Sequence, residues 1–364
     1  MPSGTTSRDR LRYAGSLTAV DLFAGAGGAT QGLKDAGFSV IGAVENDPAA
    51  AESYSLNHAE VELWEADIRK VSARSILSVL GLKPRQLTLL KACPPCQGFS
   101  SLAEGRVKVD ASQNDLVIDT LRFVRALLPA AVMIENVLGL GRDLRSELVI
   151  DELRRLGYVA QKYQVNAIQF GVPQRRKRLI ILALRGRRKI LPDTLPAYGL
   201  DHPVSVKSAF DELAEALKEN SDDPLDVART LTPAVAERVA AVPIDGNRFD
   251  LPPEHQLDCH KRIGGARTAT ASYGRLKAHF PAPTMTTRCT TPACGSFIHP
   301  TEDRGITLRE AATLQTFPFG YRFSGTYGQI ERQIGNAVPV KMVAVLGLFL
   351  TGLLHVQSTT DNRS

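Results

Sequence analysis

The sequence contains no apolar run long enough to cross a membrane, which limits where the protein can act. Its most apolar segment, Val343–Val356, is shorter than the roughly 20 residues that span a bilayer, so a buried helix is the better interpretation. The first fifteen residues are polar and lack the apolar core of a signal peptide. We therefore expect a cytoplasmic protein with no membrane partner.

Cysteine is scarce, and neither glycine, proline nor charge of one sign is in marked excess. Five cysteines cannot all pair, which favours reduced thiols. The 29 glycines and 21 prolines exclude a collagen-like or low-complexity chain. With 43% apolar and 23% charged residues, the chain can bury a core. Its net charge of +6, from 44 Lys and Arg against 38 Asp and Glu, admits a polyanionic partner without establishing one.

Short apolar runs alternate with helical patterns through the first half of the chain. This alternation predicts an α/β fold, a Rossmann-like, doubly wound and mostly parallel sheet. One helix is expected to end near Gly37 and another to begin at Pro48. The runs expected as strands are Leu17–Phe23, Phe38–Val44, Val61–Trp64, Leu87–Ala92, Ala131–Glu135, Tyr163–Val165 and Arg178–Leu184.

The length of 364 residues exceeds one core of roughly 250–300 residues, so we expect a second, smaller domain. Residues 187–280 are rich in proline, carry an acidic stretch at Asp211–Asp223 and show little periodicity. Thr307 and Glu310 predict a capping box at the start of a helix, and a last helix is expected over Pro339–His355. The expected boundaries are a tail at 1–16, a large domain at 17–186, a small domain at 187–323, a segment returning to the large domain at 324–356, and a tail at 357–364.

The residues that end the first three strands suit a nucleoside-bearing cofactor. In the first loop Thr30 breaks the dinucleotide pattern G-x-G-x-x-G, but Gly25 still allows close backbone approach. Glu45 follows Gly25 by 20 residues, the spacing at which an acid binds ribose hydroxyls. Asp67 ends the third strand, where it can accept from an adenine amino group. S-adenosylmethionine fits this pattern, although the glycine loop alone is equally consistent with a structural turn.

Two further strand ends carry a thiol and a carboxyl group, Cys96 and Glu135. Cytosine C5 is a poor nucleophile until a thiolate adds at C6, and an acid bonded to N3 takes up the developing charge. Parallel strands place both residues at the edge of the sheet that bears the glycine loop. A basic run over Arg175–Lys189 contains eight positive charges and no acid. It indicates a phosphate backbone or a flipped base nearby, against the simpler interpretation of a solvated basic face.

Taken together, these segments resemble the C5 cytosine-specific DNA methyltransferase family, in the family's motif order and over most of the chain. The segments that carry the resemblance are DLFAGAGG, ENDPAA, EADI, PPCQGFS, ENV, QRRKR, RGITLREAATLQTFP and GNAVP. The resemblance implies a DNA (cytosine-5-)-methyltransferase that transfers a methyl group from S-adenosylmethionine to a flipped-out cytosine in double-stranded DNA. It implies a catalytic and cofactor-binding role for the large domain and target recognition for the small one.

The resemblance also assigns residues. It implies that Cys96 is the nucleophile, that Glu135 contacts N3, and that Arg176 and Arg178 support the flipped base and the catalytic loop. The cofactor positions are Phe23, Gly25, Gly27, Gly28, Glu45, Asn46, Asp67, Ile68 and Asn336. Ala92-Cys93 departs from the small Gly or Ser pair that is usual in the family, and this creates the spacing C-x-x-C with Cys96. We expect a monomer from a bacterial restriction–modification system or a solitary methyltransferase, with any cognate restriction endonuclease acting separately.

Other interpretations remain open at this stage. The C-x-x-C could be a redox pair or part of a zinc site, although an interdomain structural role for Cys259 and Cys289 is favoured over zinc. The substrate could be tRNA, or the chain could be a DNA-binding protein that has lost catalysis. The candidate base-reading residues are Arg262, Arg267, Thr268 and Thr270. A loop that contacts only phosphates explains each of these four equally well.

Overall fold

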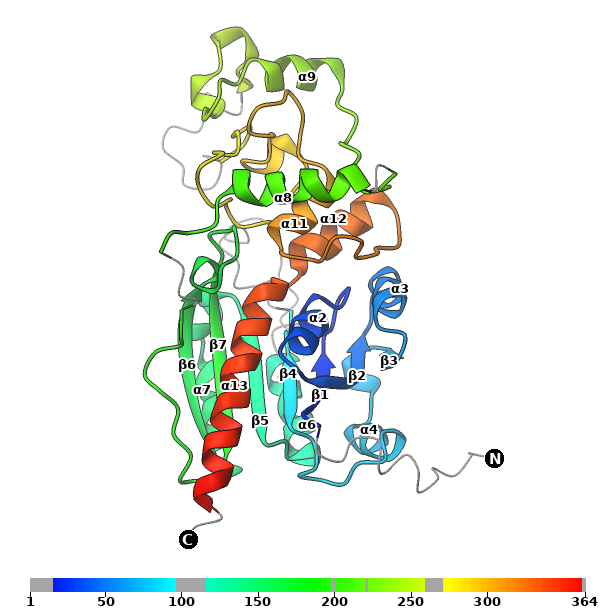
Figure 1. Cartoon of the computed structure of the whole chain (residues 1–364), viewed down its shortest axis with the longest axis vertical. Helices are drawn as coiled ribbons and strands as arrows, with labels where there is room; N and C mark the ends of the chain where they lie inside the picture. The colour runs from blue at the N-terminus through cyan, green and yellow to red at the C-terminus, as the bar shows by residue number, and fades with distance from the viewer. Residues whose placement is uncertain (1–15, 96–115, 198–200, 220–221, 259–270, 362–364) are drawn as a thin grey trace, which may run out of the picture. The chain divides into compact units, whose positions relative to one another are not determined.

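The computed structural model describes residues 16–95, 116–197, 201–219, 222–258 and 271–361, which fall into two compact units (Figure 1). Unit 1 comprises Met1–Val165, Lys177–Tyr198 and Val340–Ser364, and unit 2 comprises Asn166–Arg176 and Gly199–Pro339. The functional domain boundaries expected from the sequence stay a prediction, because compactness does not define function.

Unit 1 is built on a seven-stranded sheet in the order β3-β2-β1-β4-β5-β7-β6. All seven expected strands are present: β1 Thr18–Leu22, β2 Ser39–Glu45, β3 Glu62–Glu65, β4 Leu89–Ala92, β5 Ala131–Asn136, β6 Tyr158–Asn166 and β7 Lys177–Arg185. The β1–β2, β2–β3, β1–β4 and β4–β5 pairs are parallel, whereas β7 runs antiparallel to β5. The prediction of a doubly wound, mostly parallel sheet is confirmed. The strand order reverses between the parallel strands β1 and β4, and such sheets bind ligands at this point.

Local sequence signals account for the helices that follow the first two strands. α2 (Gly28–Asp35) leads into Gly37, whose φ of 87° is the left-handed conformation that glycine adopts readily. α3 (Pro48–Asn57) begins at Pro48 as expected, and the Asp47 carboxylate accepts from the N–H groups of Ala49 and Ala50. The remaining helices of this unit are α4 (Ala73–Val79), α6 (Leu116–Leu127), α7 (Leu144–Arg155) and α13 (Val340–Asp361).

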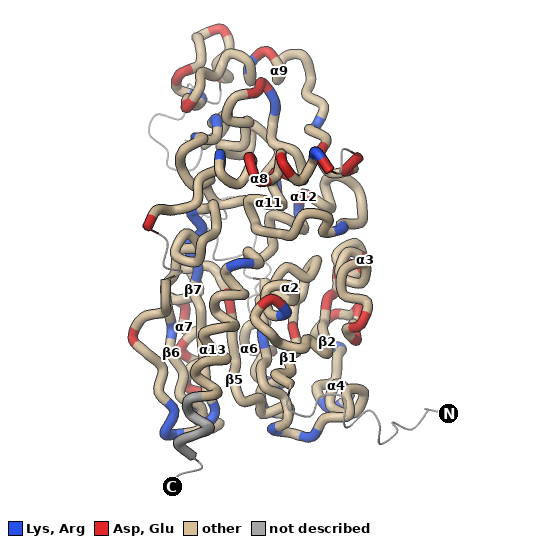
Figure 2. Tube along the Cα trace, viewed as in Figure 1, with Lys and Arg blue, Asp and Glu red and all other residues tan. Residues whose placement is uncertain are grey.

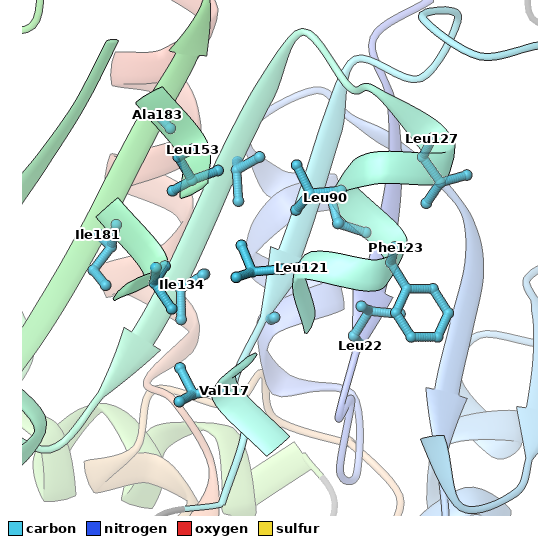
Figure 3. Packing of buried hydrophobic residues seen from close by; sticks show 14 of the residues in the cluster. Leu22, Leu90, Val117, Leu121, Phe123, Leu127, Ile134, Leu153, Ile181 and Ala183 are labelled. Carbon is cyan, nitrogen blue, oxygen red and sulfur yellow. The ribbon is translucent and has the colours of Figure 1, made fainter. Parts of the chain in front are cut away.

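One face of the sheet forms the main core (Figure 3). Alternate strand residues such as Leu22, Leu90 and Ile134 pack there against α4, α6 and α7, and these three residues are fully buried. On α6, Leu121 and Phe123 are among the side chains that cover the strands. Because side chains alternate along a strand, the residues between them face the opposite side of the sheet. Asp21, Lys91 and Glu135 therefore share that second face.

The C-terminal helix α13 packs against α2, where glycines bring the two helices close together. A Cβ atom at Gly347 would lie 2.6 Å from the Ala36 Cβ, and one at Gly32 would lie 2.8 Å from the Val343 Cβ. Residues Tyr327–His355 form a span long and apolar enough, by length and composition only, to cross a membrane. The expectation that this apolar segment is too short to span was therefore wrong. The burial of residues such as Leu346 and Leu350 nevertheless supports a core helix.

Unit 2 contains α8 (Val206–Glu219), α9 (Pro233–Ala240), α11 (Leu308–Leu314) and α12 (Tyr327–Asn336). The predicted capping box is confirmed: Glu310 N–H donates to Thr307 Oγ1 at 3.0 Å, and Thr307 N–H donates to Glu310 Oε2 at 2.7 Å. The expectation of little periodicity before residue 280 was wrong. Most of the acidic stretch lies on α8, a 14-residue helix that buries Val206, Ala209 and Leu213 on one side.

Candidate active site

The glycine loop after β1 contains three residues with left-handed backbone. Phe23, Gly25 and Gly27 have φ values of 59°, 56° and 92°, and α2 begins at Gly28. Left-handed backbone is costly for a residue with a Cβ, so Phe23 is held in a strained conformation of the kind that collects at functional sites. A Cβ placed on Gly25 would meet nothing within 4 Å. The loop therefore leaves open space above Gly25.

Glu45 at the end of β2 is tied directly to this loop. Its Oε2 accepts from Gly25 N–H at 2.7 Å, and its Oε1 accepts from the N–H groups of Asn46 and Asp47 at 2.9 and 2.8 Å. Only 9% of the residue is exposed, and burial raises the pKa of its carboxyl group against the opposing effect of these hydrogen bonds. Oε2 retains a lone pair, since a carboxylate offers about four acceptor sites. A ribose hydroxyl donating to Glu45 therefore fits the chemistry of this position.

Asp67 follows β3, as expected, and its side chain already has a cationic partner. Its carboxylate accepts from Arg69 Nε and Nη2, and this pairing, reinforced by Arg69 N–H, lowers its pKa to about 2. Asp67 also caps the 3₁₀ turn Ile68–Lys70, in which Ile68 is buried. An adenine amino group at this carboxylate would share it with Arg69. The loop, Glu45 and Asp67 thus fit a nucleoside-bearing cofactor.

Beneath the loop, a polar network occupies the second face of the sheet. Asp21 on β1 pairs with Lys91 on β4 at 2.9 Å, and both side chains are almost completely buried. Thr30 Oγ1 donates to Asp21 Oδ2 at 2.9 Å and lies 2.9 Å from the Tyr54 hydroxyl. Burial, the largest single influence, lowers the pKa of Lys91, but Asp21 together with the neighbouring Cys93 and Glu135 outweighs it, so the pKa of Lys91 is raised. The cofactor loop and the strand that leads to Cys96 therefore share one buried ion pair.

The predicted catalytic carboxylate, Glu135, lies between two partners on neighbouring strands. Arg178 Nε on β7 is 2.8 Å from Glu135 Oε1, and Cys93 Sγ donates to Oε2 at 2.8 Å. Glu135 is 5% exposed, so its charge is shielded from water. Burial, together with the negative charge of Glu135, raises the pKa of the Cys93 thiol well above its ordinary value. Cys93 consequently keeps its proton and acts as a hydrogen-bond donor.

The chain just before Cys96 is anchored on both sides. Cys93 N–H donates to the Leu22 carbonyl at 3.2 Å, and Asn136 Nδ2 donates to the Pro94 carbonyl at 3.0 Å. The ends of β1 and β5 therefore fix where the segment that carries Cys96 begins. Cys96 itself lies outside the described residues, as do Arg262, Arg267, Thr268, Thr270 and Cys259.

Two predicted site residues, Arg176 and Asn336, belong to unit 2. The Arg176 side chain is 4% exposed, and its Nη1 donates to the carbonyls of Met285 and Gly335 at 3.1 and 3.3 Å. It thus holds the residue that precedes Asn336, which is exposed at the end of α12. Cys289 is buried within the same unit, with its Sγ 3.9 Å from the Glu331 carbonyl.

The basic run over Arg175–Lys189 does not form one cluster in the structure. Because β7 runs through it, the run divides between the two ends of that strand, and Figure 2 shows basic positions near both. The register of the antiparallel β5–β7 pair places Leu179 beside Asn136 and Leu184 beside Ala131. Lys177 and Arg178 therefore lie at the end where β5 finishes, and Arg185 lies at the far end. There Arg185 Nη1 donates to the Leu128 carbonyl.

The sequence reasoning missed Cys93, Lys91 and Asp21 as parts of the site. The register of the strands is what brings these residues together. Asp21 on β1 pairs with Lys91 on β4, and Lys91 pairs with Met133 on β5. Two residues further along both strands, Cys93 falls opposite Glu135. Side chains at i and i+2 share a face, so the pattern Lys91-x-Cys93 placed both groups on the face of the sheet that bears the predicted catalytic carboxylate.

Comparison with known proteins finds relatives that match nearly the whole chain. The family model for C-5 cytosine-specific DNA methylase matches residues 17–348. The Type II methylase M.HgiDII of Herpetosiphon aurantiacus is 32% identical, covering 92% of this chain and 96% of its own length. The Type II methyltransferase M.PspPI of a Psychrobacter strain is 33% identical, covering 93% and 80%.

Solved structures show the same architecture. A prophage-encoded candidate DNA modification methyltransferase from E. coli is 25% identical, with a TM-score of 0.68 over 93% of this chain and 100% of its own. The S. pombe Dnmt2 methyltransferase, 20% identical, shares the fold with a TM-score of 0.59 over 93% and 99%.

Proposed function

The chain belongs to the C-5 cytosine-specific DNA methylase family and acts as a DNA cytosine-5 methyltransferase, and we propose that Cys96 and Glu135 carry the reaction. The acceptor is a flipped-out cytosine in double-stranded DNA, and the methyl donor is S-adenosylmethionine. The observation that carries this proposal is the environment of Glu135 at the carboxyl end of β5. Arg178 forms an ion pair with its carboxylate and Cys93 donates a hydrogen bond to it, and the segment that leads into Cys96 begins beside it.

The cofactor assignment is supported by the loop and the acid that faces it. Gly25, Gly27 and Gly28 supply close backbone approach, and Glu45 supplies a buried acceptor for ribose. Phe23, Asn46, Asp67 and Ile68 border the same strand ends, and Asn336, which belongs to unit 2, is proposed as a cofactor residue from the family resemblance alone. When bound, S-adenosylmethionine supplies an electrophilic methyl group.

The proposed chemistry uses a thiol and a carboxyl group in separate roles. The Cys96 thiolate adds to C6 of cytosine, and the ring electrons move to C5. C5 then bonds to the methyl carbon as the methyl–sulfur bond of the donor breaks and its sulfur leaves as a neutral thioether. Glu135 hydrogen-bonds N3 and balances the charge that develops there. Loss of the C5 proton and expulsion of the Cys96 thiolate restore the aromatic ring. Arg178 holds Glu135 in place, and Arg176 organises the chain around Asn336.

DNA is favoured over tRNA as the substrate. The relatives reported above are Type II methylases, and the chain covers 96% and 80% of their lengths. Their names also support a bacterial restriction–modification role, in which the enzyme acts as a cytoplasmic monomer and the cognate endonuclease is a separate chain. Arg262, Arg267, Thr268 and Thr270 are proposed to contact DNA.

One experiment tests reaction, substrate and target together. Purified protein is incubated with S-adenosylmethionine and either duplex DNA or tRNA, and 5-methylcytosine is mapped by bisulfite sequencing. We expect methylation at one short recurrent sequence in DNA and none in tRNA. The Cys96→Ser variant serves as the matched control, because it removes the nucleophile while retaining the contacts that bind DNA. Methylation of tRNA alone, or full turnover by Cys96→Ser, contradicts the proposal.

The covalent step has its own test. Fluorine at C5 of cytosine cannot leave as a proton does, so the adduct between Cys96 and the base persists. We expect duplexes that contain 5-fluorocytosine within the target site to give a complex resistant to denaturing electrophoresis. Active methylation of ordinary DNA without such a complex would remove thiol addition from the mechanism.

A further inference from the structure

Cys93 is the one cysteine among the described residues that contacts the predicted catalytic carboxylate. The parallel β4–β5 register pairs Lys91 with Met133 and Ala92 with Ile134. Extended by one residue, the same register places Cys93 directly opposite Glu135. Side chains directly opposite each other on neighbouring strands lie close together. The contact is therefore built into the sheet rather than made by a mobile loop.

The geometry of the contact is that of an oriented donor. Cys93 Sγ donates to Glu135 Oε2 at 2.8 Å, and Arg178 Nε lies 2.8 Å from Oε1. Each carboxylate oxygen thus has one partner: Cys93, directly after β4, on one side and Arg178, on β7, on the other. Two contacts at separate oxygens fix both the position and the plane of a carboxylate, whereas one contact would let it rotate about the Cγ–Cδ bond.

Nearby charges keep the thiol in its donor form. The ionisable groups that face Cys93 are Glu135, Lys91 and Arg178. Burial and Glu135 raise the pKa of Cys93 more strongly than Lys91 and Arg178 lower it. At neutral pH the thiol is protonated, so it is suited to donating a hydrogen bond and unsuited to acting as a nucleophile or a metal-bound thiolate.

We propose that Cys93 is a positioning residue for the methyl-transfer reaction: its thiol orients Glu135 so that the carboxyl group meets N3 of the target cytosine. This inference rests on the proposed role of Glu135. It assigns a function to the first cysteine of the C-x-x-C pair. Cys96 is the nucleophile, and Cys93 orients the carboxyl group of Glu135. The two cysteines thus have different chemical states and separate tasks.

The test compares Cys93→Ala with Cys93→Ser, each alone and combined with Glu135→Gln. Alanine removes the donor, and serine keeps a donor of similar size. We expect Cys93→Ala to lower single-turnover methyl transfer about tenfold, the scale of one lost hydrogen bond to a charged group. KM for S-adenosylmethionine should change less than twofold, and Cys93→Ser should recover most of the rate.

The double variants separate positioning from packing. If Cys93 acts through Glu135, Cys93→Ala should cost little further activity in the Glu135→Gln background, because residues in one network are non-additive. A tenfold loss in both backgrounds, or no loss in either, overturns the inference. Cys289→Ala is the matched control: it empties a buried thiol site within unit 2, so it should lower the melting temperature without changing turnover at saturating substrates.

Failure of the underlying function is distinguishable from failure of the inference. If Glu135→Gln alone leaves turnover unchanged, Glu135 is not the catalytic acid and the proposed function fails first. If Glu135→Gln is severely impaired while Cys93→Ala is fully active, the proposed function stands and only the positioning role of Cys93 is lost.

Discussion

A single buried side chain beside the glycine loop, His58, has a pKa that its surroundings shift strongly. His58 is 1% exposed, its Nε2 lies 3.2 Å from the Gly27 carbonyl, and its Nδ1 lies 2.9 Å from Lys34 Nζ. A carbonyl only accepts and an ammonium only donates, so the proton must be on Nε2 and the ring must be neutral. Burial, and secondarily the charge of Lys34, lowers the pKa of His58 to about 4.

The neutral state of His58 predicts a loss of stability in mild acid. Between pH 6.5 and pH 4 the unfolded chain binds a proton at His58 that the folded chain does not. The stabilising contribution is complete above pH 6.5 and falls as the pH drops through this window, by about 3 kcal/mol. Urea unfolding at pH 7 and pH 4.5 should therefore show a smaller decrease for His58→Gln than for the natural protein. Equal decreases in the two proteins would contradict the assignment.

Arg178 predicts a separation of turnover from cofactor binding. Arg178→Gln removes the charged partner of Glu135 Oε1 but leaves the Gly25–Glu45 contact intact. We expect kcat to fall about 100-fold, which corresponds to an increase of about 2.7 kcal/mol in the activation free energy. The Kd for S-adenosylmethionine should stay within twofold of the value for the natural protein. Arg178→Lys should recover only part of the loss, because an ammonium lacks the planar geometry of guanidinium. A parallel loss of cofactor affinity would mean that Arg178 supports the fold.

For single residues, the positions of those that end a strand could be predicted from the sequence, whereas contacts between neighbouring strands could not. Gly25, Glu45 and Glu135 could be placed from sequence because parallel strand ends meet at one edge of a sheet. The Cys93–Glu135 contact depends on the exact register of β4 against β5. A shift of one residue would turn Cys93 to the opposite face, and the apolar pattern of β4 alone does not fix that register.

At the scale of elements, the Lys91–Asp21 pair couples β1 to β4 beneath the site. Asp21 faces Lys91 in the strand register and also accepts from Thr30 on α2. One ion pair thus connects the strand that precedes the glycine loop, the helix that follows it and the strand that leads to the proposed nucleophile.

Breaking this pair from one side should be costly. Lys91→Met leaves the Asp21 carboxylate buried with no cation, which typically costs about 3–5 kcal/mol. We expect the double variant Lys91→Met with Asp21→Asn to recover part of this loss, because it removes the uncompensated charge. The free energy of unfolding in urea measures both. A cost below about 1 kcal/mol for Lys91→Met would show that the pair contributes little net stability.

The strands were predictable as elements because most are apolar on both faces, which is typical of a covered parallel sheet. α8 was missed for the opposite reason. It buries only Val206, Ala209 and Leu213, at spacings of three and four, among charged residues and in a proline-rich region. Such a helix is stabilised by its contacts within unit 2 more than by its own composition.

At the scale of the whole molecule, the arrangement of charge is more informative than its sum. The eight basic residues between Arg175 and Lys189 form two groups of four, which the apolar residues Leu179–Leu184 of β7 separate. A nine-residue strand extends roughly 26 Å between its end residues. This is about three Debye lengths at physiological salt, so the two groups of charges act independently on a bound polyanion.

This separation predicts that two exposed cations near opposite ends of β7 differ in their effect on DNA binding. Lys177 is exposed at the end of β7 beside the carboxyl end of β5, and Arg188 is exposed beyond the opposite end. Each substitution to glutamine removes one positive charge, so the net charge is matched. If DNA lies over the edge that bears Glu135, Lys177→Gln should reduce the slope of log Kd against log salt concentration by about 0.9, the value for one lost phosphate contact. Arg188→Gln should leave that slope unchanged, because its charge lies too far from the same phosphates.

Binding titrations between 50 and 200 mM salt measure both slopes. The Cys96→Ser background is used for both variants to prevent turnover. Equal reductions would place DNA along the whole strand, and a reduction for Arg188→Gln alone would place it at the opposite end.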